Sequence, residues 1–316
     1  MSPGSRTLLG ASAAALVAVL AVAAAGCGRR APAAPRVAAS VFPLYDVVRR
    51  VAGDRVAVDL ILPPGQDTHS FDPRPRDVAR LAEAQLVFAV GLGLDDWVAR
   101  MARDASGGRA RVFEVGPLVD PILVPEQVLR LVEDEPGEAR PDEEGLPRPI
   151  DPHFWLDPVR MQRATDVVVE ALQRLHPEEA PLYRSRGDEV KRSLGELHQR
   201  TARRAAAWRG RKLVTFHGSL YTFADRYGLE VAAVVEPVPG REPTARYLAR
   251  VLEAIRRTGP VAIFTEPQLD PRAARVIAQE AGLPLHEIDP VGGGEGLDTY
   301  EKLLAQVVSV LDRALS

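Results

Sequence analysis

The sequence predicts an α/β protein with two similar lobes, each built on a four-stranded, mostly parallel sheet flanked by helices. Short β-rich runs alternate with amphipathic stretches, which is the pattern of βα units and parallel sheets. Four such runs lie in the first half of the chain and four in the second half. A helical region without a strand signal separates the two groups, so two sheets are expected rather than one long sheet.

The expected elements follow one another along each half of the chain. In the first half we expect strands over residues 37–42, 56–62, 86–90 and 111–115, with helices over 76–84 and 95–104. In the second half we expect strands over 213–216, 231–235, 261–265 and 285–288, with helices over 220–227, 244–257, 271–281 and 299–315.

Two long helices are predicted between the two groups of strands. Apolar residues repeat at helical spacing over 158–175, and residues 182–208 continue as a helix of about seven turns, or roughly 40 Å. Gly195 weakens this second helix by about 1 kcal/mol relative to Ala. We interpret residues 37–178 as the N-terminal lobe, 179–208 as a rigid connecting helix and 209–316 as the C-terminal lobe.

The N-terminus has the features of an export signal. Arg6 precedes an uncharged apolar stretch over 8–25, and small residues then lead to Cys27, as in a bacterial lipobox. We therefore expect residues 1–26 to be a lipoprotein signal peptide, Cys27 to carry the lipid, and residues 27–36 to be a tether. The alternatives are a plain signal peptide or a single membrane anchor. The expected location is the periplasm or the outer side of the cell membrane.

The composition excludes several classes of site. Cys27 is the only cysteine, so the mature domain has no disulfide and no thiolate metal site. The formal charge of −3 becomes −3 − 1 = −4 once Arg6 is removed, which is too mild to indicate binding to nucleic acid. Residues 126–144 are strongly acidic and contain Pro and Gly, so we expect a solvated loop there. The alternative is a weak cation-collecting loop.

Four residues far apart in the chain are candidate metal ligands: His69, His153, His217 and Asp298. They are separated by 84, 64 and 81 residues (153−69, 217−153 and 298−217), so folding would have to assemble the site. His69 and His217 follow expected strands, which is where open parallel sheets bind ligands. Three imidazoles and a carboxylate complete the tetrahedron of a closed zinc site. This indicates capture rather than catalysis, although Asp298 also fits the N-cap of the last helix.

Motifs spread over the chain resemble one family. From Ser40 onwards the sequence is similar to the solute-binding proteins of bacterial zinc and manganese ABC importers, the ZnuA/TroA-like group also known as metal-binding cluster A-I. The matching stretches are SVFPLYDVVRRVAGD, LPPGQDTHSFDPRPRD, AVGLGLDDW, DPHFWLDP, FHGSLYTFADRYGL, IFTEPQLDP and LDTYEKLL.

The resemblance implies a function, a site and partners. It implies two α/β lobes joined by a long rigid helix, with a metal ion held in the cleft by His69, His153, His217 and Asp298. It also implies a membrane permease and its ATPase as partners, for a protein that we expect to be a monomer. Zinc is favoured as the cargo because His217 stands where manganese-binding relatives tend to have a carboxylate, and imidazole suits zinc. Manganese remains the alternative.

Two functions of other classes remain open at this point. A zinc hydrolase would need an open coordination position and a base, and Glu236 and Glu266 follow expected strands, although no H-E-x-x-H motif is present. A binder of a small organic ligand would need a sizeable pocket with aromatic walls, whereas Trp97, Trp155 and Trp208 are scattered along the chain. Nothing in the sequence argues for a surface adhesin.

Overall fold

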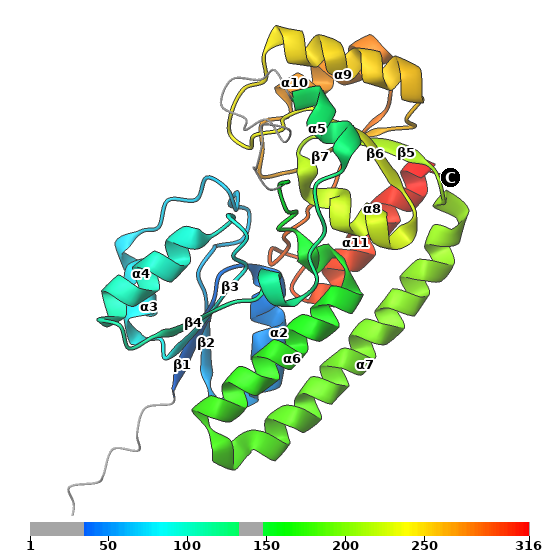
Figure 1. Ribbon diagram of the computed structural model, residues 1–316. Helices are drawn as coiled ribbons and strands as arrows, with labels where there is room; N and C mark the ends of the chain where they lie inside the picture. Colours follow the sequence, from blue (N-terminus) through cyan, green and yellow to red (C-terminus); the bar gives the residue numbers. More distant parts are fainter. Residues whose placement is uncertain (1–34, 133–147, 316) are drawn as a thin grey trace, which may run out of the picture. The chain divides into compact units, whose positions relative to one another are not determined.

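The computed structural model describes residues 35–132 and 148–315, which belong to one compact unit (Figure 1). The expected signal peptide, the lipidation site Cys27 and most of the acidic segment lie outside the described residues. No helix in the described part of the chain is both long and apolar enough to cross a membrane.

Two four-stranded parallel sheets form the framework, as the sequence predicted. The first sheet has the order β2-β1-β3-β4, and its strands are β1 (Arg36–Ala39), β2 (Ala57–Leu60), β3 (Leu86–Ala89) and β4 (Arg111–Glu114). The second has the equivalent order β6-β5-β7-β8, with β5 (Lys212–Thr215), β6 (Glu230–Val234), β7 (Ile263–Thr265) and β8 (Leu285–Glu287). The central strands β1, β3, β5 and β7 are almost entirely buried, as expected for parallel sheets covered by helices.

Helices connect the strands within each half of the chain. Those that follow strands of the first half are α2 (Phe42–Ala52), α3 (Pro75–Glu83), α4 (Asp96–Ser106) and α5 (Glu126–Val132). Those of the second half are α8 (Tyr221–Tyr227), α9 (Ala245–Thr258), α10 (Arg272–Ala281) and α11 (Tyr300–Leu315). Between the two groups lie α6 (Pro158–Leu175) and α7 (Ala180–Ala205), the long helices that the sequence predicted.

Helix α5 corrects one expectation, because the acidic segment was expected to be a loop from residue 126 onwards. Val128, Leu131 and Val132 in this helix are buried, and the last two belong to the core of the second sheet. The charged residues of the segment dominated its interpretation from sequence, whereas the apolar residues at helical spacing decide the structure of its start.

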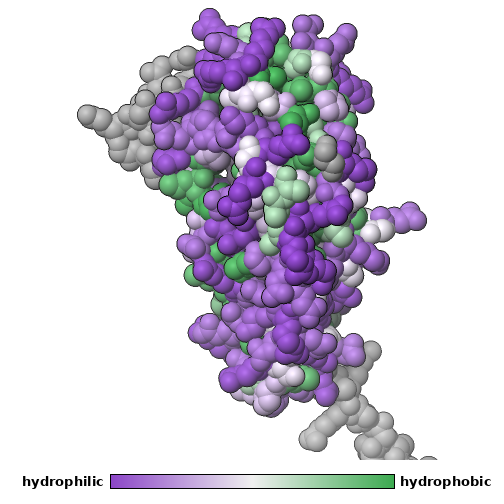
Figure 2. All heavy atoms as spheres, turned by 90° about the vertical axis from the view of Figure 1, so that its right-hand side faces the viewer, coloured by the Kyte–Doolittle hydropathy of each residue, from purple (hydrophilic) through white to green (hydrophobic). Residues whose placement is uncertain are grey.

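One hydrophobic core extends across both halves of the chain. It includes Phe88 of β3 and Phe264 of β7 as well as Leu194 of α7. Because this core is continuous, it does not mark where one lobe ends and the next begins. The expected boundaries of the N-terminal lobe (37–178), the connecting helix (179–208) and the C-terminal lobe (209–316) stay predictions. The opposite side of α7 is charged, and the face of the molecule on that side is largely hydrophilic (Figure 2).

Glycines inside α7 allow α6 and α7 to pack closely along their length (Figure 1). A Cβ atom at Gly187 would lie only 2.3 Å from Cγ2 of Val169 in α6. At Gly195 the nearest atom would be Nε2 of Gln162, at 3.0 Å. Gly187 is therefore required by helix packing, whereas at Gly195 the end of the flexible Gln162 side chain would have to move by only a few tenths of an ångström.

We expect Gly187→Ala to lower the free energy of unfolding by about 1 kcal/mol, because overpacking costs about 1–3 kcal/mol and exceeds the gain in helix propensity. Gly195→Ala, the matched control in the same helix, should be neutral or stabilising. Urea unfolding of both variants measures the difference. Equal stabilisation by both substitutions would contradict the packing role of Gly187.

Candidate metal centre

Three of the four predicted ligands meet in the structure. His69 follows β2, His217 follows β5, and His153 immediately precedes the short turn of helix that leads into α6. The Nε2 atom of His153 lies 3.3 Å from Nε2 of His69 and 3.2 Å from Nε2 of His217. The ligand atoms of the three side chains all lie within 4.8 Å of one another.

These distances suit a common metal ion. Zinc binds imidazole nitrogen at about 2.0–2.1 Å, which separates two ligands of a tetrahedron by about 3.3–3.4 Å. Without a metal, two neutral imidazoles whose Nε2 atoms face each other can form a hydrogen bond only if one of these nitrogens carries the proton and the other does not. A shared cation satisfies all three nitrogens at once.

The topology of the second sheet explains why a carboxylate accompanies His217. Strands β5 and β7 are neighbours, so the residues after their carboxyl ends, His217 and Glu266, arrive side by side. Glu266 Oε1 lies 2.5 Å from Nδ1 of His217, and the two side chains form an ion pair when this imidazole is protonated. The contact does not have the geometry of a hydrogen bond. The same oxygen accepts a hydrogen bond from the hydroxyl of Ser219 at 2.8 Å. Both carboxylate and imidazole are buried.

Asp151 has the corresponding place beside His153. Its Oδ1 lies 2.8 Å from Nδ1 of His153 and also accepts the backbone N–H of His153 at 3.0 Å. Sequence reasoning missed this role of Asp151 and considered Glu266 only as a possible base. The spacing D-P-H was a usable signal for Asp151, because a side chain two residues before a histidine can reach its backbone N–H.

The surroundings of His69 and His217 shift the pKa values of these two side chains in opposite directions. Burial first, and then His153 and His217, lower the pKa of His69 to about 2. Burial alone would lower the pKa of His217. The negative charges of Glu266 first, and then of Asp67 and Asp151, outweigh burial, so the pKa of His217 is raised. Without metal, His69 is therefore neutral and His217 retains a proton to higher pH than a free histidine.

Asp298 does not join the histidines. Its side chain is 65 % exposed, and Oδ1 lies 2.6 Å from Nζ of Lys302, which also lowers the pKa of this carboxyl. It does not cap α11 either, because the hydroxyl of Thr299 accepts the N–H of Lys302 at 3.2 Å and Asp46 accepts the N–H of Tyr300. Neither role expected for Asp298 appears in this arrangement, since Lys302 one turn later provides its partner.

A cavity of about 150 Å³ lies beside the three histidines and has mostly apolar walls. Its lining includes Val128 and Val132 of α5, together with Tyr221. Ligand pockets for organic molecules usually measure about 300–1,000 Å³, so the described part of the site suits a small ion better than an organic molecule. Trp155 serves packing, since its ring lies against His153 and Nε1 donates to the carbonyl of Pro290 at 2.7 Å.

Comparison with known proteins gives several relatives over most of the chain. The manganese-binding lipoprotein MntA of Halalkalibacterium halodurans is 25% identical over 313 residues, covering 95% of this chain and 97% of that protein. The zinc-binding lipoprotein AdcA of Streptococcus pneumoniae is 24% identical over 274 residues, or 87% of this chain. This chain spans about half the length of AdcA, with 53% of it matched.

Solved structures share the fold. A crystal structure of ZnuA superposes with a TM-score of 0.75 at 24% identity, covering 90% of this chain and all of that one (100%). The solute-binding protein FpvC of Pseudomonas aeruginosa, solved in complex with Mn²⁺, also gives 0.75 at 24% identity, covering 89% of this chain and 98% of that one.

The family model described as zinc-uptake complex component A, periplasmic (ZnuA), matches residues 37–314. Its members are components of metal transport rather than enzymes. The protein belongs to this ZnuA family.

Proposed function

We propose that the protein captures a divalent transition metal outside the cytoplasm and delivers it to the permease of an ABC importer, which an ATPase drives. The observation that carries the proposal is the meeting of three Nε2 atoms at metal-sharing distances from three distant parts of the chain. Relatives named as zinc-binding and manganese-binding lipoproteins support the same function. We also propose export as a lipoprotein anchored through Cys27, and a monomeric state.

Zinc is the proposed cargo, with manganese as the alternative. All three clustered ligands are imidazoles, and imidazole nitrogen suits zinc, whereas manganese prefers oxygen. A hydrolytic role has less support, because Glu266 is already engaged by Ser219 and His217, and Glu236 by the N–H of Gly240 at 2.6 Å. Neither carboxylate is positioned as an uncommitted base.

Asp289 is a second candidate for a fourth ligand beside Asp298, and neither aspartate belongs to the cluster that the three histidines form in this structure. Asp289 follows β8, which neighbours β7, so it approaches the same sheet edge as Glu266. Gln268 and the backbone N–H groups of Val291 and Gly292 donate hydrogen bonds to its Oδ1, at 2.8–3.0 Å. The next residue, Pro290, contacts Trp155, whose ring packs against His153. Asp298, in contrast, would have to leave Lys302.

Purified protein should bind one zinc ion per chain and should prefer zinc to manganese. Chelator competition on metal-stripped protein, followed by elemental analysis, measures stoichiometry and preference together. Tighter binding of manganese would reject the preference for zinc. Failure to bind either ion would reject the proposed function.

The two aspartates can be separated by conservative substitution. Asp289→Asn should weaken zinc binding at least tenfold if Asp289 is a ligand, because a neutral amide replaces an anionic oxygen. Asp298→Asn should leave zinc affinity within about threefold and barely change the melting temperature of the metal-free protein, since exposed ion pairs contribute about 0–1 kcal/mol. A strong loss in Asp298→Asn alone would restore Asp298 as the ligand.

Metal affinity should fall as pH decreases, and the decline should begin above pH 6.5. A proton on His217 competes with the metal, and its raised pKa means that this proton is still bound at a pH where a free histidine has lost it. His69, with a pKa of about 2, adds no competition near neutral pH. Zinc titrations between pH 8 and pH 5 test this. An affinity that is constant over that range would argue against His217 as a ligand.

A further inference from the structure

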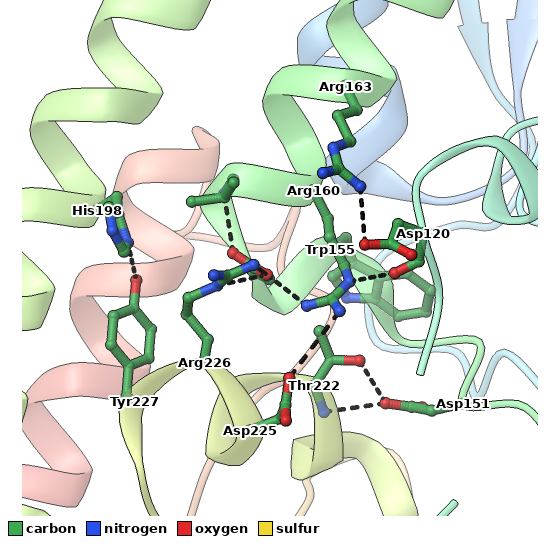
Figure 3. Close-up of polar contacts among 12 residues, drawn as sticks. Asp120, Asp151, Trp155, Arg160, Arg163, His198, Thr222, Asp225, Arg226 and Tyr227 are labelled. Atoms are coloured by element: carbon green, nitrogen blue, oxygen red, sulfur yellow. Dashed lines mark hydrogen bonds and ion pairs between the residues drawn. The ribbon is translucent and has the colours of Figure 1, made fainter. Parts of the chain in front are cut away.

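Asp151 is a buried carboxylate that joins two distant parts of the chain (Figure 3). Its Oδ1 accepts the backbone N–H and the ring Nδ1–H of His153, at 3.0 and 2.8 Å. Its Oδ2 accepts the backbone N–H and the hydroxyl of Thr222 in α8, at 3.0 and 2.6 Å. The residue is 1% exposed, so these four donors replace the water that an ionised carboxylate would otherwise hold.

The arrangement fixes how His153 presents its ring. An ionised carboxylate only accepts hydrogen bonds, so Nδ1 of His153 carries the proton and the lone pair of Nε2 is available to a metal. We propose that Asp151 is a positioning residue: it holds His153 in the metal-binding tautomer and orientation, within the same frame that carries His217. This inference rests on the proposed function.

The frame is the segment that leads from β5 into α8. His217 follows β5, and Thr222 comes five residues later in the sequence. Glu266 contacts both Ser219 in this segment and the Nδ1 of His217. Asp151 therefore ties His153 to the backbone that also places His217, although 64 residues separate the two histidines.

Charge gives Asp151 a second effect. Three neutral imidazoles bring no charge to a divalent cation, and the cavity beside them has mostly apolar walls. Asp151 and Glu266 place two carboxylates directly behind two of the three ligands. The negative charges of these two carboxylates partly balance the charge of a divalent ion on the other side of the imidazole rings. A carboxylate that accepts the Nδ1–H of an imidazole also increases the basicity of its Nε2.

A purely structural role for Asp151 is the competing explanation, and Asp157 provides the matched control. Asp157 is also fully buried and also joins the two halves of the chain, since it accepts bonds from Arg160 at 2.6 Å and from Arg226 at 2.7 and 2.8 Å. None of its hydrogen bonds within the described residues involves His69, His153 or His217. Removing either carboxylate weakens the contact between the halves, but only Asp151 touches a ligand.

The test compares Asp151→Asn with Asp157→Asn in the full mature chain. Zinc affinity is measured by chelator competition, the coordination geometry by the visible absorption of bound Co²⁺, and stability by the melting temperature of the metal-free protein. We expect Asp151→Asn to lose zinc affinity by about 10–100-fold and to alter the Co²⁺ spectrum. Asp157→Asn should lower the melting temperature yet keep zinc affinity within about threefold and retain the wild-type spectrum.

A graded pair of variants covers the case in which Asp151→Asn does not fold. Thr222→Val removes the hydroxyl that Asp151 accepts and should weaken zinc binding several-fold, whereas Thr222→Ser keeps a hydroxyl and should restore most of the affinity. Wild-type affinity in both Asp151→Asn and Thr222→Val would overturn the inference, as would an equal loss in Asp157→Asn. A wild-type protein that binds no zinc would reject the proposed function itself.

Discussion

The segment from Asp151 to Trp155 is the constraint on which the proposed metal centre depends. Asp151 bonds to Thr222, and Trp155 donates to the carbonyl of Pro290. The backbone carbonyl of Trp155 also accepts the hydroxyl of Tyr300 at 2.6 Å. These contacts lie within and just after the D-P-H motif, so His153 is held against the second half of the chain by buried polar bonds. Losing one partner of such a bond leaves an unsatisfied buried group, which makes the arrangement specific.

The other two histidines depend on the topology of the sheets. Both sheets have the same strand order, and in each one a proposed ligand follows the carboxyl end of a strand, β2 for His69 and β5 for His217. Neighbouring strands then deliver carboxylates to the same edge, as Glu266 does after β7. A parallel sheet thus collects side chains that are far apart in sequence, and the carboxylates that support the ligands come with them.

Sequence reasoning found the sheets from local patterns, and it singled out the three histidines from their settings together with the resemblance of the surrounding motifs to a known family; the structure brings these three side chains together. Strand runs are short and apolar, and a histidine placed just after such a run indicates a sheet edge. It failed where the deciding partner is remote or chemically ordinary. Thr222 lies 71 residues from Asp151, and no spacing rule connects them. The assignment of Asp298 from its motif stays a prediction, because in this structure its carboxylate pairs with Lys302 one turn later. Helix α5 was missed because its charges obscured its apolar residues.

The central claim is that His69, His153 and His217 share one metal ion. X-ray absorption at the zinc edge of the protein loaded with one equivalent of zinc tests it most directly. The account predicts a shell with three imidazole nitrogens at about 2.0–2.1 Å, with the outer-shell scattering that imidazole rings produce, and one further light atom. A shell dominated by oxygen, or one with a single imidazole, would contradict it.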